Sequence, residues 1–251
     1  MNLLTVSKER VTTGLALVSG VLIIGFIDNF FLMWLFLGAV YILAFYEAMK
    51  LFDIKNSDLI YFAVGVWLLA AIYPHSDDLF ILICLAYASA VAFNRDLNWK
   101  NFLPFIYPTA GMLFILAMYQ GYGVLSLLWL LVIVAMTDIG AYAVGVSMGK
   151  TPFSPTSPNK TLEGVLGGLA VATMGGMFVG LSIVDLGVSI VIAFMVSLSS
   201  IFGDLFESLL KRIAGVKDSG NILPGHGGVL DRIDGYLFGG IVMLVLLRGL
   251  V

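Results

Sequence analysis

The chain has 251 residues, of which 60% are hydrophobic and only 12% are charged, and its mean hydropathy is +1.03. A soluble domain carries about 25% charged residues, so this composition excludes a water-soluble globular protein and predicts that lipid is the solvent for most of the chain. The net charge of −3 decides little, because the placement of the charges matters more than their sum. The single cysteine, Cys84, lies in an apolar run and excludes an intrachain disulfide.

Nine apolar segments predict transmembrane helices, and together they predict an all-α, polytopic integral membrane protein. In chain order they cover residues 12–27, 30–48, 59–73, 79–93, 102–119, 123–147, 164–183, 187–207 and 235–250. A helix needs about 20 residues to cross a hydrocarbon core of about 30 Å, so the shorter segments have soft boundaries. The first segment has no clear small-residue cleavage site, and we expect it to be retained rather than cleaved as a signal peptide.

The distribution of Lys and Arg predicts the orientation of the chain. If the N-terminus is cytoplasmic, 12 of the 13 basic residues lie in inside segments, and only Arg248 lies outside. The outside loops, at 74–78, 120–123 and 184–187, are then short, and every substantial polar loop faces the cytoplasm. We therefore expect a multi-pass protein of the inner, cytoplasmic cell membrane, with its site on the cytoplasmic side, where nucleotides are found.

Polar residues that could carry chemistry are unevenly spread and divide the chain into two predicted regions. Residues 1–122 are interpreted as an N-terminal transmembrane scaffold, because their charges lie at span ends, as topology requires. Residues 123–251 form the predicted C-terminal catalytic region. Its two polar segments, 149–161 and 208–234, are predicted to be cytoplasmic loops.

Proline and small residues predict three local features. Pro104 and Pro108 should bend the fifth span, because each removes a helix hydrogen bond. A three-residue spacing of prolines favours an extended, polyproline-like path in the first loop, at Pro152, Pro155 and Pro158. A four-residue spacing of small residues predicts close helix packing in the seventh span, along Gly164, Gly168, Ala172, Gly176 and Gly180.

Acidic residues near the cytoplasmic ends of the spans are candidates for a metal site. Asp138 lies within the sixth span, where a carboxylate costs about 2.5–3.5 kcal/mol on insertion scales, so a functional role is favoured over a bond to a neighbouring helix. Asp204 and Glu207 share one helical face at i and i+3, and Asp231 and Asp234 repeat that spacing. If these pairs converge on one pocket they suit Mg²⁺; simple solvation of helix ends is the structural alternative.

Cations close to these carboxylates indicate a site that handles phosphate. They are Lys150, Lys160, Lys211, Arg212, Lys217 and Arg232. Arg forks onto phosphate oxygens and Lys supplies a point charge, although topology or attraction to anionic lipid would also place cations here. Their interleaving with Asp218, Asp231 and Asp234 favours a metal–phosphate site. Glycines on both sides of His226 allow the backbone to approach a ligand closely.

The polar stretch 208–234 resembles the signature of the membrane phosphatidate cytidylyltransferases, or CDP-diacylglycerol synthases. The resemblance has no mismatch over 27 positions and rests on Ser208, Lys211-Arg212, Lys217-Asp218, Gly220, Leu223-Pro224, His226-Gly227-Gly228, Asp231-Arg232 and Asp234. Residues 138–142 and 157–164 resemble two further family blocks, with Ile139 and Asn159 where members often have Thr and Lys. The first half of the chain agrees only as a hydrophobic pattern.

The resemblance implies that CTP and phosphatidate react to give CDP-diacylglycerol and pyrophosphate, a step of phospholipid biosynthesis. It implies a Mg²⁺-dependent site, with a second, monovalent cation such as K⁺, and a homodimer in the lipid bilayer with no nucleic-acid partner. In the family, the acidic residues that match Asp204 and Asp231 hold metal. Asp138 is then either a further metal ligand or a partner of one.

Roles for individual side chains follow from the charge that such a reaction has to handle. Metal ions and basic side chains stabilise the pyrophosphate leaving group. The predicted catalytic residues are Asp204, Asp231, Lys211, Arg212, Lys217 and Asp218. The predicted substrate-binding residues are Ser157, Lys160, Ser208, His226, Gly227, Gly228, Arg232 and Asp234.

Two other interpretations stay open. A CTP-dependent polyprenol or phytol kinase, or an archaeal CDP-lipid synthase, is remotely similar; a kinase would transfer the γ-phosphoryl group and release CDP, so the released product discriminates. An ion or solute transporter that uses Asp138 and Asp204 is less favoured. Transporters often have internal repeats with matching broken helices, the sequence has none, and the cation-rich segment would be unexplained.

Overall fold

The computed structural model describes residues 8–251, which are almost entirely helical. The helices are α1 (Lys8–Ile27), α2 (Phe30–Leu51), α3 (Leu59–Ile72), α4 (Asp78–Phe93), η1 (Trp99–Phe102), η2 (Phe105–Thr109), α5 (Ala110–Met148), α6 (Leu162–Gly180), α7 (Leu186–Ile213) and α8 (Leu230–Leu250). Two short strands, β1 (Pro152–Ser154) and β2 (Ser157–Thr161), form an antiparallel hairpin. The prediction of an all-α polytopic membrane protein is confirmed.

Within the described residues, five helical stretches are long and apolar enough to cross a membrane: Phe30–Leu51, Trp99–Met148, Leu162–Gly180, Leu186–Ile213 and Leu230–Leu250. Shorter apolar helices cover Val11–Ile27, Leu59–Ile72 and Asp78–Phe93. Each predicted span lies mostly in helix, as expected where lipid offers the backbone no hydrogen bonds. The number of crossings, the two-region division and the cytoplasmic N-terminus stay predictions, and residues 1–7 lie outside the described part.

The helical stretch from residue 99 to 148 is interrupted twice. Tyr107 has a non-helical backbone conformation between Pro104 and Pro108, so the bend predicted for the fifth span is present. Gly123 has a φ of 72°, in the left-handed region that glycine adopts without strain. It divides α5 into two arms, which correspond to the fifth and sixth predicted spans.

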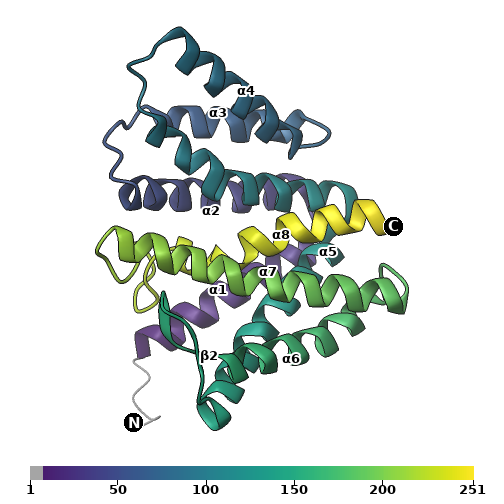
Figure 1. The fold of residues 1–251 in the computed structure, drawn as a ribbon. Helices are drawn as coiled ribbons and strands as arrows, with labels where there is room; N and C mark the ends of the chain where they lie inside the picture. The colour runs from purple at the N-terminus through teal and green to yellow at the C-terminus, as the bar shows by residue number, and fades with distance from the viewer. Residues whose placement is uncertain (1–7) are drawn as a thin grey trace.

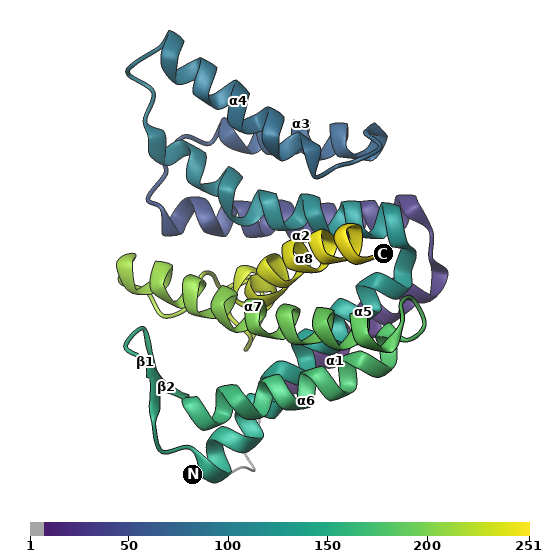
Figure 2. The same cartoon turned by 45° about the vertical axis from the view of Figure 1, so that its right-hand side comes forward.

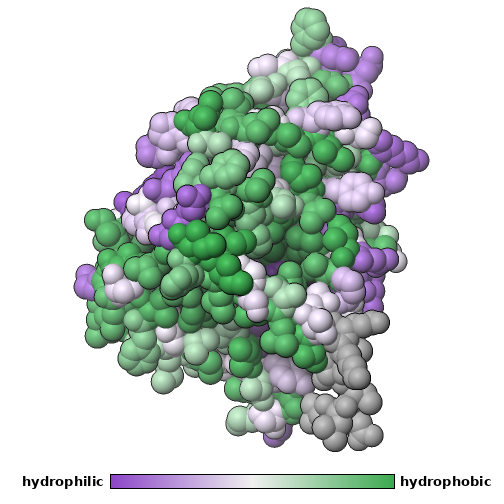
Figure 3. Space-filling view, turned by 180° about the vertical axis from the view of Figure 1, so that it is seen from behind, coloured by the Kyte–Doolittle hydropathy of each residue, from purple (hydrophilic) through white to green (hydrophobic). Residues whose placement is uncertain are grey.

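The helices form two groups, which α5 connects (Figures 1 and 2). Helices α2, α3 and α4 lie together on one side, and α6, α7 and α8 lie on the other. Helix α5 packs against α2, α6 and α8. Seen from behind, the molecule exposes broad apolar areas, with hydrophilic side chains gathered mainly toward the edges (Figure 3). Such extensive exposed apolar surface suits a lipid environment.

A stripe of small residues lets α6 lie close against α5. The stripe is buried along its whole length, at Gly164, Gly168, Ala172, Gly176 and Gly180. A methyl group added at Gly168 would lie 2.7 Å from the carbonyl oxygen of Thr137 in α5, so the predicted packing role is confirmed. The Thr137 hydroxyl is also 2.7 Å from the Ser197 hydroxyl of α7. The turn of α5 that carries Asp138 is therefore fixed between α6 and α7.

The loop 149–161 is extended, as its prolines predict, but it pairs as a hairpin instead of following a free polyproline path. A two-stranded hairpin has only edge strands, where proline is tolerated. The carboxylate of Glu163, in the first turn of α6, accepts hydrogen bonds from the backbone N–H groups of Lys150 and Thr151 at 3.0 and 3.1 Å. These contacts hold the base of the hairpin against α6 and position Lys160.

The polar stretch 208–234 is helical at both ends instead of being a loop throughout. Helix α7 continues to Ile213 and α8 begins at Leu230. The Glu207–Lys211 pair, spaced i,i+4, favours the continuation of α7 beyond the apolar segment. The residues between the two helices are irregular, with positive φ at Gly215, Gly225 and Gly227.

An ion pair ties the C-terminal end of α8 to the start of α4. The Arg248 guanidinium donates to both carboxylate oxygens of Asp77, whose side chain is 6% exposed. We expect Asp77→Asn to lower the free energy of unfolding by about 1–3 kcal/mol, because Arg248 loses its charged partner at a partly buried position. Thermal unfolding in detergent measures this loss, and an unchanged unfolding temperature would contradict it.

Candidate active site

Polar residues from four parts of the chain line one cavity of about 260 Å³. The lining comes from α5, α7, the segment between α7 and α8, and α8, and consists of Asp138, Ser200, Asp204, Lys211, Asp218, Asp231, Arg232, Asp234 and Gly235. Seven of these nine residues were predicted as site residues; Ser200 and Gly235 were not. Counted at formal charges, five carboxylates against two basic side chains leave an excess of three negative charges, which Lys160, paired with Asp204 from outside the lining, reduces to two. An anionic ligand would therefore need additional cations to enter.

Asp204 of α7 lies where the hairpin meets the cavity. Lys160 of β2 forms an ion pair with its carboxylate. One turn along α7, the Ser208 hydroxyl donates to the other Asp204 oxygen at 3.4 Å. Asp138 lines the same cavity from α5 and is exposed to it. The structure thus brings together residues from all three sequence blocks that carried the family resemblance.

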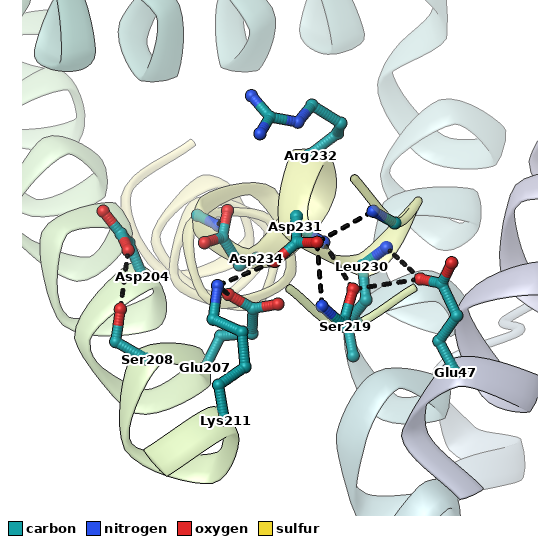
Figure 4. A network of polar contacts seen from close by, with 12 residues as sticks. Glu47, Asp204, Glu207, Ser208, Lys211, Ser219, Leu230, Asp231, Arg232 and Asp234 are labelled. Carbon is teal, nitrogen blue, oxygen red and sulfur yellow. Dashed lines mark hydrogen bonds and ion pairs between the residues drawn. The ribbon is translucent and has the colours of Figure 1, made fainter. Parts of the chain in front are cut away.

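Lys211 lies between two carboxylates on neighbouring helices (Figure 4). Its Nζ is 2.7 Å from Oδ1 of Asp231 in α8, and it also pairs with Glu207 one turn earlier in α7. The side chain of Glu207 is fully buried, and its oxygens have no hydrogen-bond partner within residues 8–251. Lys211 is therefore the ion-pair partner of this buried carboxyl group.

The connecting segment wraps around the carboxylate of Asp231. Its Oδ2 accepts the backbone N–H groups of Ser219 at 2.9 Å and of Gly228 at 2.8 Å. Gly227 has a φ of 82°, and a Cβ there would lie 2.8 Å from the same oxygen. The signature glycines thus let two amide groups approach Asp231, and Oδ1 remains directed at Lys211.

The remaining signature residues shape the wall of the cavity. Arg232 donates from Nε to the carbonyl oxygen of His226 at 3.1 Å, which holds the glycine-rich turn against α8. The His226 ring Nδ1 lies 3.4 Å from the Pro224 carbonyl oxygen. Asp234 lines the cavity and accepts the N–H of Gly235 at 2.8 Å. Its carboxylate and those of Asp138 and Asp204 come from three different helices.

Two predicted catalytic cations do not reach this cavity. Arg212 and Lys217 are exposed, and neither forms an ion pair within the described residues. Both lie outside the cavity lining, as do the predicted substrate-binding residues Ser157 and His226. Their roles as ligands for phosphate or substrate stay predictions.

Glu47 of α2 contacts the signature segment and was absent from the predicted site. Its side chain is 1% exposed and accepts hydrogen bonds from the backbone N–H groups of Val229 and Leu230. It also accepts the hydroxyl proton of Ser219, a second residue that was not predicted. The sequence offered only a weak signal, because Glu47 lies one residue before the end of the second predicted span, 30–48, where a carboxylate also fits a topological role.

The donor chemistry of the cavity fits a hard cation. Carboxylate and hydroxyl oxygens are the ligands that Mg²⁺ prefers, and the cavity offers five carboxylates together with the hydroxyl of Ser200. Within residues 8–251, no three His, Cys, Asp or Glu side chains are close enough to enclose a metal ion in this structure. Lys160 forms an ion pair with Asp204, and Lys211 forms one with Asp231, so each of these carboxylates has a positively charged neighbour.

Comparison with known proteins identifies the family of the chain. A family model described as "Cytidylyltransferase family" matches residues 8–250. The phosphatidate cytidylyltransferase of Helicobacter pylori (strain J99) is 42% identical over 243 residues, which are 96% of this chain and 91% of that protein. That of Thermotoga maritima is 37% identical over 225 residues, or 80% and 82% of the two chains. Because the family model spans the described chain almost from end to end, the chain belongs to the cytidylyltransferase family.

Proposed function

We propose that the chain transfers the cytidylyl group of CTP to phosphatidate, which forms CDP-diacylglycerol and releases pyrophosphate. The observation that carries this proposal is the polar cavity, which places carboxylates and basic side chains from α5, α7 and α8 together in an otherwise apolar chain. Relatives that are similar over most of their length and are named phosphatidate cytidylyltransferase support the choice of lipid acceptor.

The reaction needs little acid–base chemistry from the protein. A phosphatidate oxygen, already anionic, attacks the α-phosphorus of CTP, and the bond from that phosphorus to the bridging oxygen breaks. The electron pair leaves with pyrophosphate. The barrier lies in bringing anions together and in stabilising the leaving group. In this proposal Lys211 and Arg232, which line the cavity, and Lys160, which pairs with Asp204 beside it, would contact phosphate oxygens.

The other predicted residues have supporting roles in this proposal. Arg212 and Lys217 are exposed and would attract the nucleotide from solution. Asp218 and Asp234 line the cavity and would orient the basic groups around the phosphates. Ser157, Ser208 and the turn formed by His226, Gly227 and Gly228 complete the proposed substrate contacts.

Mg²⁺ is part of the proposal, with Asp204 and Asp231 as its ligands and Asp138 as a further ligand or a partner of one. When bound, Mg²⁺ supplies positive charge to the triphosphate. The excess of carboxylates in the cavity supports this requirement. Lys160 and Lys211 would then exchange their carboxylate partners for phosphate oxygens. A second, monovalent cation such as K⁺ is proposed from the family resemblance alone.

The membrane setting is proposed on the same basis. With the predicted orientation, the cavity faces the cytoplasm from the inner membrane, so CTP reaches it from solution. Phosphatidate is insoluble in water and would enter sideways between helices without leaving the bilayer. A homodimer is proposed from the family resemblance.

An assay of purified protein in detergent tests the proposed reaction. Phosphatidate, Mg²⁺ and CTP labelled separately at the α and γ phosphates are supplied, and we expect the α label in the lipid and the γ label in pyrophosphate. The γ label in the lipid would instead identify a kinase. If neither label is transferred by folded protein, the proposal fails, and solute flux into proteoliposomes would then support a transporter.

A further inference from the structure

Glu47 caps the first turn of α8 from a distant part of the chain (Figure 4). Its Oε1 accepts the N–H of Val229 at 3.1 Å, and its Oε2 accepts the N–H of Leu230 at 2.8 Å. The first N–H groups of a helix have no partner within the helix, and negative charge is stabilising at this end. The N-cap residue, Val229, has no side chain that could accept these hydrogen bonds, so Glu47 supplies the cap.

Ser219 connects this cap to the carboxylate of Asp231. The Ser219 hydroxyl donates to Oε2 of Glu47 at 3.2 Å, and its oxygen accepts the N–H of Asp231 at 3.3 Å. The backbone N–H of Ser219 donates to Oδ2 of Asp231 at 2.9 Å. A continuous hydrogen-bonded chain therefore runs from Glu47 through Ser219 to the Asp231 carboxylate, which lines the cavity.

Two glycines of the signature segment leave space for Glu47. A Cβ at Gly228 would lie 2.5 Å from Oε2 of Glu47, and a Cβ at Gly220 would collide with Oε1. Neither glycine has a positive φ, so the requirement for glycine comes from this close approach and not from backbone conformation. The signature segment is therefore shaped around a side chain that the signature does not contain.

We propose that Glu47 is a positioning residue, which acts through Ser219 to fix the Asp231 carboxylate for cation binding. The inference rests on the proposed function, because Asp231 is the proposed ligand of Mg²⁺. A role in stability alone would also explain a buried cap. Glu47 does not line the cavity, so a role in stability alone predicts that substituting Glu47 leaves the cation affinity of the folded protein unchanged.

The test compares Glu47→Gln with Asp77→Asn. Both acids are buried and tie an N-terminal helix to α8, Glu47 at its first turn and Asp77 at its last. Gln keeps the size of Glu47 but cannot accept from all three donors. We expect both variants to unfold at a lower temperature, and only Glu47→Gln to lose turnover per folded molecule, by about 10- to 100-fold.

A cation titration supplies a readout that does not depend on turnover. Mn²⁺, a paramagnetic substitute for Mg²⁺, is titrated by electron paramagnetic resonance into folded protein without lipid. We expect the half-saturating Mn²⁺ concentration to rise about 10- to 100-fold in Glu47→Gln and to stay unchanged in Asp77→Asn. The KM for phosphatidate should be unchanged in both variants.

Ser219→Ala tests whether Glu47 acts on Asp231 through Ser219, and it serves as the second variant if Glu47→Gln does not fold. We expect Ser219→Ala to raise the half-saturating Mn²⁺ concentration, and the double variant to bind Mn²⁺ no more weakly than Glu47→Gln, because linked residues are non-additive. The proposal is overturned if Glu47→Gln binds Mn²⁺ as tightly as the wild type. If Glu47→Gln does not fold, wild-type Mn²⁺ affinity in Ser219→Ala overturns it. Additive effects in the double variant would also overturn it. If the wild type binds Mn²⁺ but does not transfer the cytidylyl group, the proposed function fails, and the Mn²⁺ comparison still decides the role of Glu47. A wild type that binds no Mn²⁺ would refute this role.

Discussion

Asp231→Asn is expected to abolish turnover while leaving the protein folded. Asn keeps the shape of the side chain, and its carbonyl oxygen can still accept the N–H groups of Ser219 and Gly228 that now contact Asp231. The charge that pairs with Lys211 and is proposed to bind Mg²⁺ is lost. We expect turnover to fall by at least about 10²- to 10³-fold, as when one preorganised contact to developing charge is removed. The rate of labelled CDP-diacylglycerol formation across a Mg²⁺ titration measures this loss.

Matched variants show whether the loss belongs to the metal site. Asp204→Asn should lose turnover to a similar extent, because Asp204 is the other proposed ligand. Lys55 is exposed between α2 and α3, outside the cavity, so Lys55→Ala should leave turnover unchanged. Mg²⁺-dependent activity near that of the wild type in either Asn variant would contradict the metal assignment. A large loss in Lys55→Ala would show that the site has been misplaced.

The helical architecture could be predicted from the sequence because a membrane permits few alternatives. Lipid cannot satisfy backbone hydrogen bonds, so each long apolar segment has to form a helix. The bend near Pro108 and the buried face of α6 followed from proline and from the four-residue spacing that begins at Gly164. The length of the apolar segments did not predict that α7 and α8 extend into the polar stretch. Those extra turns are stabilised by polar pairs such as Glu207 and Lys211.

The sequence motif accounts for which residues the structure brings together at the cavity, while their roles stay predictions. Asp204, Lys211 and Asp231 meet at one cavity because α7 and α8 pack together next to their connecting segment. Arg212 was grouped with Lys211 in the sequence, yet successive helical residues point about 100° apart. Lys211 therefore faces α8 whereas Arg212 is exposed.

Glu47 shows which part of a site a motif cannot reveal. It lies more than 170 positions before Ser219, and its contacts are largely to backbone N–H groups, which every residue except proline carries. No spacing of side chains along the sequence records such a contact. Asp138 lies well inside its predicted span and was recognised as a candidate, whereas Glu47 lies next to the end of its span, where a charge is also expected from topology.

Lys211→Met is expected to lower both stability and turnover, through two different partners. Removing the ammonium group takes the ion-pair partner from the fully buried Glu207 and from Asp231, and breaking a buried ion pair in this way costs about 3–5 kcal/mol. Turnover should fall as well, because Lys211 is proposed to contact phosphate. Unfolding in detergent and the rate of cytidylyl transfer per folded molecule measure the two effects separately.

The double variant Lys211→Met/Glu207→Gln separates these two roles of Lys211. Neutral Gln removes one of the two buried carboxyl groups that lose Lys211, so part of the lost stability should return, while Asp231 keeps its two backbone N–H donors. Turnover should stay low, because neither Met nor Gln can supply positive charge to a phosphate oxygen. Lys217→Met is the matched control for stability, since Lys217 is exposed and forms no ion pair within the described residues. If stability and turnover recover together in the double variant, Lys211 serves only to neutralise Glu207, and the cation that contacts phosphate must be sought at Arg232 or Lys160.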